Sequence, residues 1–347
     1  MNTKLITFYL PQFHRIKEND EWWGEGFTEW TNVKKSKPLY EGHNQPRVPL
    51  DNSYYDLSKK ETLEKQAKLA KEYGIYGFCF YHYYFNGRKL LEKPAEILLE
   101  NKEIDLNYCF SWANEPWTRS WDGKTRDVIM PQSYGGKKEW KEHFEYLLPF
   151  FKDKRYIKKE NKPLFLIYRT NNIPNCEDMI NYWEKLAINN GFNGIYLLET
   201  LNSFQKNPIL NSSKGVVEFE PMLTMRHYLK PTIQLKRLLR KKIGLLDIVN
   251  YDDVWSQIIK RDNDYGKERY LGAFVGWDNT PRKGKKGLII DNSTPEKFGN
   301  YLKIQKNKNN TEFVFINAWN EWAEGAYLEG DELNSKNYLK QIMRVQK

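Results

Sequence analysis

Two carboxylates, Glu321 and Glu324, lie three residues apart just after an apolar run. The run, residues 313–316, consists of phenylalanine, valine and isoleucine and predicts a buried strand. If a helix follows that strand, the spacing places both carboxyl groups on one face, with Cβ atoms about 5–6 Å apart. Two carboxyl groups about 5 Å apart, one protonated and one charged, can cleave a glycosidic bond with retention. The alternative is a solvated helix start that the helix dipole stabilises.

Amide and indole side chains flank the two carboxylates in the sequence. Asn320 is placed to hydrogen-bond a sugar hydroxyl, and Trp319 and Trp322 are placed to stack on a pyranose face. Large apolar rings are costly to expose unless they bind something. The stretch therefore predicts a sugar-binding active site in which Glu321 and Glu324 are the catalytic residues.

Eight short apolar runs alternate with segments of helical periodicity along the whole chain. This alternation predicts a single α/β domain over residues 1–347, a (β/α)8 TIM-type barrel. In such a barrel, catalytic residues lie at the carboxyl ends of the strands. The predicted strands cover residues 5–13, 75–85, 106–112, 164–168, 195–199, 216–220, 271–275 and 313–316.

Polar and aromatic residues gather where these predicted strands end, and we interpret them as the lining of a substrate pocket. Glu115 follows the third strand and is either a substrate-binding residue or a second candidate for the acid, facing Glu321. His82 is either a pocket residue or a buried structural histidine. The predicted substrate-binding residues are Gln12, His14, Trp30, His82, Tyr83, Trp112, Asn114, Glu115, Glu220, Trp277 and Asn320.

Three segments between the strands depart from a plain barrel. The loop after the first strand, residues 16–50, is long and rich in tryptophan, and we expect it to fold over the barrel mouth. Residues 222–262 form a basic insertion after the sixth strand, in which lysine and arginine alternate with leucine and isoleucine. The insertion predicts either an amphipathic helix on an anionic membrane surface or a surface helix packed on the barrel. The basic stretch 282–286 either holds a phosphate at the mouth or forms a solvated loop.

The composition indicates which binding partners and which cellular compartment to expect. A net charge of +10 favours an acidic partner, such as a phosphorylated glycan carrier or anionic lipid, and the sequence has no nucleic-acid-binding module. Three cysteines are too few for a disulfide framework. The sequence has no dinucleotide loop, P-loop or zinc motif, so we expect no cofactor and no metal. Because it shows neither a leader peptide nor an apolar span, we expect a cytoplasmic protein.

The residues around the carboxylate pair resemble a known family signature. Residues 320–325 resemble the Glu-Trp-x-Glu-Gly signature of family 99 glycoside hydrolases, the endo-α-mannosidases and endo-α-mannanases, with Ala323 at the variable position. Residues 9–14, 22–30, 112–115 and 320–322 together resemble the WbsX family of bacterial surface-polysaccharide biosynthesis proteins, which carry a family-99-like domain.

The resemblance implies a function and a role for each carboxylate. Glu321 would be the base that acts on the sugar 2-hydroxyl to give a 1,2-anhydro intermediate, and Glu324 the general acid and later base. The implied enzyme acts on a glycosidic bond of a bacterial O-antigen or capsule, and its oligo- or polysaccharide substrate is free or linked to a lipid phosphate. The alternatives are a glycosyltransferase that uses an activated donor and an inactive glycan-binding barrel.

Overall fold

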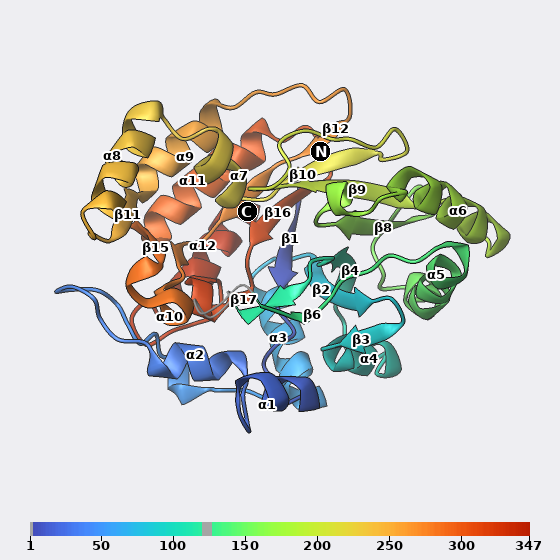
Figure 1. Cartoon of the computed structure of the whole chain (residues 1–347), viewed down its shortest axis with the longest axis horizontal. Helices are drawn as coiled ribbons and strands as arrows, with labels where there is room; N and C mark the ends of the chain where they lie inside the picture. Colours follow the sequence, from blue (N-terminus) through green and yellow to red (C-terminus); the bar gives the residue numbers. More distant parts are fainter. Residues whose placement is uncertain (1–2, 120–126) are drawn as a thin grey trace.

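Eight parallel strands form a closed ring in the computed structural model, which describes residues 3–119 and 127–347 (Figure 1). The barrel strands are β1 (Lys4–Tyr9), β2 (Gly77–Phe85), β4 (Asn107–Trp112), β8 (Lys162–Ile167), β9 (Tyr196–Leu201), β10 (Gly215–Glu218), β12 (Glu268–Tyr270) with β13 (Gly272–Phe274), and β16 (Phe313–Asn317). Strands β12 and β13 are one strand interrupted at Leu271; β12 pairs with β10 and β13 pairs with β16, which closes the ring. The predicted (β/α)8 barrel is confirmed.

The barrel strands are apolar on both faces because helices cover them outside and side chains fill the barrel inside. In β8 five of six residues are buried, and in β16 all five are buried. The helices that cover the barrel are α3 (Lys60–Glu72), α4 (Lys93–Glu100), α5 (Lys137–Lys152), α6 (Cys176–Asn189), α9 (Tyr251–Lys260), α11 (Pro295–Lys308) and α12 (Asn337–Gln346). Within the described ranges no helix is long and apolar enough to cross a membrane.

The loops at the carboxyl ends of the strands carry most of the remaining elements. After β1 come α1 (Lys17–Trp23), α2 (Glu29–Lys35) and η1 (Leu50–Asn52); after β13 come β14 (Trp277–Asp278), α10 (Thr280–Lys283), η4 (Gly284–Lys286) and β15 (Leu288–Asp291). After β16 come β17 (Asn320–Glu321), η5 (Trp322–Glu324) and β18 (Ala326–Tyr327). The other short elements that follow barrel strands are β3 (Arg88–Leu90), β5 (Trp117–Thr118), β6 (Val128–Met130) and η3 (Thr170–Asn172), and β7 (Lys158–Lys159) precedes β8. Both α2 and α10 contact η5.

The region predicted as a basic insertion contains four elements, α7 (Met222–His227), α8 (Pro231–Lys242), β11 (Asp247–Asn250) and α9. Helix α9 buries Tyr251, Val254, Trp255 and Ile258, at the spacing of a helix that packs on the barrel. Helix α8, which is described throughout, buries none of its residues. Strands β11, β15 and β14 form a separate three-stranded sheet beside the barrel.

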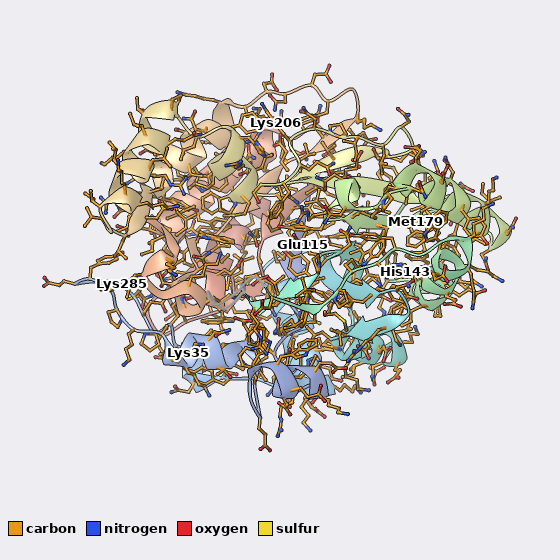
Figure 2. The ribbon with its side chains drawn as sticks, in the orientation of Figure 1. Lys35, Glu115, His143, Met179, Lys206 and Lys285 are labelled. Atoms are coloured by element: carbon orange, nitrogen blue, oxygen red, sulfur yellow. The ribbon has the colours of Figure 1, made fainter. Side chains whose placement is uncertain are left out.

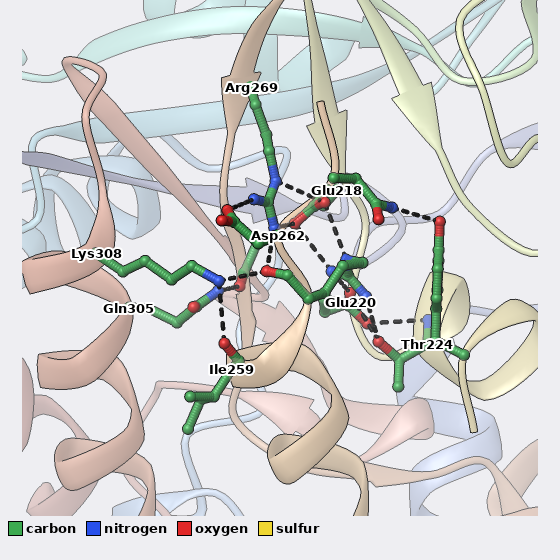
Figure 3. A network of polar contacts seen from close by, with 12 residues as sticks. Glu218, Glu220, Thr224, Ile259, Asp262, Arg269, Gln305 and Lys308 are labelled. Carbon is green, nitrogen blue, oxygen red and sulfur yellow. Dashed lines mark hydrogen bonds and ion pairs between the residues drawn. The ribbon is translucent and has the colours of Figure 1, made fainter. Parts of the chain in front are cut away.

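A buried ion-pair network joins β10 to the loop after α9 (Figure 3). The guanidinium of Arg261 donates to Glu218 Oε1 at 3.0 Å and Oε2 at 2.9 Å, and it also donates to Glu220. Thr224 Oγ1 donates to Glu220 Oε1 at 3.0 Å. The prediction that Glu220 binds substrate is therefore not supported, because its carboxylate is buried in this network.

Replacing Arg261 with methionine should destabilise the fold by about 3–5 kcal/mol, because two buried carboxylates would lose their common partner. Chemical denaturation followed by tryptophan fluorescence measures the change. The control is Arg15→Met, which removes an exposed arginine paired with Asp20 and should leave the unfolding free energy nearly unchanged. Equal stability of the two variants would contradict a structural role for the network.

Candidate active site

A cavity of about 440 Å³ opens at the carboxyl end of the barrel. Each of the eight strands contributes to its wall, at or just beyond its last residues. Five of the predicted site residues line this cavity: Tyr83, Glu115, Trp277, Glu321 and Glu324. The side chains that we selected from distant strand ends thus meet at one place, as the barrel geometry requires.

A hairpin, and not the expected helix, carries the two carboxylates. Strand β17 pairs antiparallel with β18, and the single 3₁₀ turn η5 connects them. The turn ends at Gly325, whose φ of 63° lies in the left-handed region that glycine adopts without strain. Glu321 lies at the end of β17 and Glu324 at the end of η5, and both carboxylates still line the same cavity.

Arg282 of α10 connects the two carboxylates to a third one. Its Nη1 donates to Glu324 Oε1 at 2.5 Å, its Nη2 to Glu321 Oε2 at 3.3 Å, and its Nε to Glu29 Oε1 at 2.9 Å. The guanidinium and the Glu29 side chain are buried. The side chain of Glu321 is 7% exposed and that of Glu324 is 21% exposed, so Glu324 presents more of its surface to the cavity.

The electrostatics of this group favour one retained proton. Burial raises the pKa of Glu321, and the charge of Glu324 raises it further. Burial also raises the pKa of Glu324, against the opposing charges of Arg282 and Lys283. Because one buried guanidinium faces three carboxylates, the Glu321–Glu324 pair holds a proton at neutral pH. The site thus contains an acid and a base side by side, which is the requirement for proton transfer in both directions.

Aromatic side chains form much of the remaining wall. Tyr81, Tyr83 and Tyr168 line the cavity, and burial raises the pKa of all three, so their hydroxyls are neutral and can donate hydrogen bonds. Trp277 and Trp117 add indole faces. Flat rings beside hydroxyls and carboxylates match the two kinds of surface that a pyranose presents, its C–H face and its hydroxyl rim.

Trp319 and Trp322 do not stack on substrate; both are buried and anchor the hairpin that carries the acidic pair. Their indole nitrogens donate to the two carboxylate oxygens of Glu329, Trp319 Nε1 at 3.0 Å and Trp322 Nε1 at 2.7 Å. Tyr55 and Gln66 donate to the same carboxylate at 2.8 and 2.7 Å. The tryptophans thus fix the loop that presents the acidic pair, and the prediction of sugar stacking for them is wrong.

Asn114 and Asn320 are buried clamps between neighbouring loops. Asn320 Oδ1 accepts from Leu10 N at 2.8 Å and its Nδ2 donates to Leu10 O at 2.9 Å. Asn114 makes the same pair of bonds to the backbone of Arg169, both at 2.8 Å. Each asparagine directly precedes a cavity carboxylate, Glu321 or Glu115. Their amides therefore position the acids and are not available to hydrogen-bond a sugar as we predicted.

The other predicted pocket residues are buried and do not line the cavity. His82 is buried against His143, with 2.8 Å between their Nε2 atoms, and burial lowers the pKa of His82 to about 3, so it is a neutral structural histidine (His143 is labelled in Figure 2). Trp30 Nε1 donates to Tyr55 O and Trp112 Nε1 donates to Tyr84 O. Residues outside the lining are Gln12, His14, Trp30, His82 and Trp112, all buried.

Sequence reasoning missed several of the residues that shape the cavity. Tyr81 had a signal, because alternation along a strand places residues 81 and 83 on the face opposite residues 82 and 84. Arg282 lay in a stretch that we left undecided between phosphate binding and a solvated loop, and it is buried instead. Glu29 lies within residues 22–30 of the family-like pattern, but nothing in that pattern marked it as a partner of the acidic pair. Within residues 3–119 and 127–347, no three His, Cys, Asp or Glu side chains lie together as metal ligands.

Comparison with known proteins gives one family match and two curated relatives. A family model described as Glycosyltransferase WbsX matches residues 5–342. The relatives are both named Uncharacterized protein WxcX and come from two strains of Xanthomonas campestris pv. campestris. Each is 36% identical over 334 residues, which cover 94% of this chain and 47% of the relative. The chain thus spans about half the length of these relatives.

Two solved structures share the fold. The endo-alpha-mannosidase GH99 of Bacteroides thetaiotaomicron, in complex with BIS-TRIS-propane, aligns with a TM-score of 0.59 and 12% identity and covers 99% of this chain and 96% of its own. A protein described as glycoside hydrolase-like aligns with a TM-score of 0.65 and 12% identity and covers 100% and 94%. At this identity the likeness is one of fold.

Replacing Glu329 with glutamine should lower stability by at least about 2 kcal/mol. The amide group of glutamine would face two of the four donors, which would lose their acceptor inside the protein. Thermal and chemical denaturation measure the loss. The control Glu72→Gln changes an exposed carboxylate of α3 and should have almost no effect. A Glu329→Gln variant as stable as the control would show that the indole–carboxylate contacts do not hold the hairpin.

Glu321→Gln should flatten the pH dependence of stability. The unfolded chain releases the glutamate proton above about pH 4.3, whereas the folded protein retains it because the folded pKa is raised. Stability contributed by this group is therefore present at low pH and is lost as pH rises through the folded pKa. Between roughly pH 5 and 8 the unfolding free energy of the variant should decline less than that of the parent. Equal slopes would contradict the raised pKa.

Proposed function

The chain belongs to the WbsX glycosyltransferase family, and we propose that it acts on a glycosidic bond of a bacterial cell-surface polysaccharide through Glu321 and Glu324. Its family and its fold make it a carbohydrate-active enzyme. One observation supports the assignment of Glu321 and Glu324: both carboxylates lie in the cavity wall, pair with the guanidinium of Arg282 and have aromatic rings around them.

Each carboxylate has a separate task in the proposed reaction. Glu321 removes the proton from the sugar 2-hydroxyl, whose oxygen attacks the anomeric carbon and forms a 1,2-anhydro sugar. Glu324 donates a proton to the departing glycosidic oxygen. In the second step Glu324 removes a proton from the incoming hydroxyl, which opens the anhydro ring, and Glu321 returns its proton to the 2-oxygen. The greater exposure of the Glu324 side chain to the cavity supports this division. In the reactive form the one proton that the pair shares lies on Glu324, which leaves Glu321 charged and able to act as the base.

Arg282 keeps the pair functional in both steps. A carboxyl pair without a cation in a buried wall would bind its proton too tightly to release it. The guanidinium lowers the pKa of both glutamates and contacts both carboxyl groups. Whichever glutamate is deprotonated, its negative charge therefore faces the positive charge of Arg282. Glu29 fixes the guanidinium from the opposite side at 2.9 Å.

Glu115 is the alternative acid. It lines the cavity and pairs with Arg169 at 2.7 Å, and its side chain is 34% exposed. A carboxylate that an ion pair holds at the cavity wall is placed to accept hydrogen bonds from sugar hydroxyls. We therefore assign substrate binding to Glu115, together with Tyr83 and Trp277.

The incoming hydroxyl decides between hydrolysis and transfer. Water would give a hydrolase, and a sugar hydroxyl would give a transglycosylase with the same residues. The second candidate function is a glycosyltransferase that uses an activated donor. Lys283 in the cavity wall favours it, because its exposed ammonium group could hold a donor phosphate. In either case we propose a glycan substrate that is free or linked to a lipid phosphate.

Glu321→Gln and Glu324→Gln should each lower turnover by at least about 100-fold, because each removes a proton-transfer group. The assay incubates the protein with repeat-unit oligosaccharides of its host's surface polysaccharide and identifies the products by mass. The matched control is Glu312→Gln, a carboxylate paired with Lys4 away from the cavity, which should retain turnover. Glu115→Gln should raise KM more than it lowers kcat. Full activity of either catalytic variant would exclude its role, and loss of kcat in Glu115→Gln with retained activity in Glu324→Gln would reassign the acid.

A further inference from the structure

Helix α8 packs on the rest of the protein through its polar side. Arg237 donates to both oxygens of buried Asp247, at 2.8 Å each, and Lys241 pairs with the same carboxylate at 2.8 Å. Arg240 Nε donates to Leu246 O at 3.0 Å. A surface helix normally packs through its apolar stripe and exposes its charges. In α8 the arginines point inward and fix the helix on β11.

The apolar side of α8 faces solvent as a consequence. Leu235, Leu238 and Leu239 follow the spacing of one helical stripe, and Ile243 and Leu245 continue it beyond the end of the helix. These five side chains are 52% to 71% exposed. Exposed leucines in such a group are rare on a protein that has no contact at that place. We call these five residues the α8 apolar face.

The surroundings of the α8 apolar face are strongly basic. Residues 222–246 contain seven lysines and arginines and no acidic residue. Lys230, Lys236 and Lys242 are exposed beside the leucines. Asp247 is ion-paired with Arg237 and Lys241, so its negative charge does not neutralise the exposed lysines.

A second basic segment lies at the same edge. Strands β11 and β15 are parallel, with Asp247 opposite Leu288, so the residues before each strand lie side by side. Residues 243–246 connect α8 to β11. The turn η4 and Gly287 directly precede β15. Lys285 and Lys286 of η4 are exposed there, and Lys285 is labelled on that side of the molecule in Figure 2, near α10, β11 and β15 of Figure 1.

We propose that the α8 apolar face and the lysines around it dock the protein on an anionic phospholipid bilayer. The leucines enter the boundary between head groups and acyl chains, and the lysines contact the head groups, which is how an interfacial amphipathic helix binds. Charge complementarity selects this occupant, because exposed lysines border the leucines and the segment has no acidic residue, a pattern that an apolar partner protein would not require.

The docked orientation places the active-site cavity near the bilayer. Lys283, one residue before η4, lines the cavity, and Arg282 beside it contacts the acidic pair. The same loop therefore reaches from the catalytic residues to the membrane-facing edge. This step rests on the proposed function: a glycan carried on a membrane lipid would meet the cavity with its anchor still in the bilayer.

Vesicle flotation of the purified chain, without substrate, tests the docking. The protein should float with vesicles of phosphatidylcholine and phosphatidylglycerol, not with phosphatidylcholine alone, and added salt should weaken the binding. Combined Leu235→Ser, Leu238→Ser and Leu239→Ser should lower the affinity for anionic vesicles at least about ten-fold. Combined Lys236→Glu and Lys242→Glu should do the same.

Matched variants elsewhere control for exposure and charge. Ile188→Ser, Ile209→Ser and Leu333→Ser change side chains 54% to 69% exposed, and Lys65→Glu with Lys68→Glu changes two exposed lysines of α3. Both sets should bind vesicles like the parent, and so should Glu321→Gln, which separates docking from catalysis. No binding of the parent to anionic vesicles, or equal loss in the control sets, would overturn the proposal. So would a dimer in solution that the three leucine changes dissolve, because the face would then be an interface between two copies.

Discussion

One buried guanidinium organises the loops at the carboxyl end of this barrel. Arg282 belongs to the loop after the seventh strand, Glu29 to the loop after the first, and Glu321 with Glu324 to the loop after the eighth. In a low-dielectric wall none of these charges is stable alone, so the loops can fold only in the arrangement that brings them together. The same balance leaves the pair with a proton to give, so the stability of the wall and its proposed chemistry depend on the same contacts.

A layer of neutral hydrogen bonds beneath the charges makes the arrangement rigid. Asn320 and Asn114 each join the backbone of their own loop to that of the next, directly beside Glu321 and Glu115. Glu329 accepts hydrogen bonds from the indole nitrogens of Trp319 and Trp322, beside the acidic pair. Amide and indole groups can do this because their donors and acceptors have a fixed geometry, which a hydroxyl or an ammonium lacks. Proton transfer requires such fixed distances.

The sequence was sufficient to predict the barrel, because parallel strands covered on both faces are apolar throughout and are separated by helical periodicity. It was also sufficient for the strand ends, which is why Glu321, Glu324 and Glu115 meet in the cavity as expected. The sequence could not show which polar residues at those strand ends line the cavity and which are buried. Asn320 and Tyr83 have similar local signals, yet one is a buried clamp and the other lines the cavity. Asn320 is buried because it bonds to Leu10, which lies more than 250 residues away along the chain. Arg282 and Glu29 are paired over a similar separation. Local sequence patterns carry no information about such distant partners.

The most direct test of the central claim is a crystal structure of Glu324→Gln with a repeat-unit oligosaccharide of the host's surface polysaccharide. A retained glycosidic bond would allow the intact substrate to be seen in the cavity. We expect the scissile oxygen to lie within hydrogen-bonding distance of residue 324 and the 2-hydroxyl of the same sugar to contact Glu321. The sugar ring should face Trp277 or the neighbouring tyrosines. A sugar bound elsewhere on the barrel, or one whose anomeric centre lies out of reach of both positions, would contradict it.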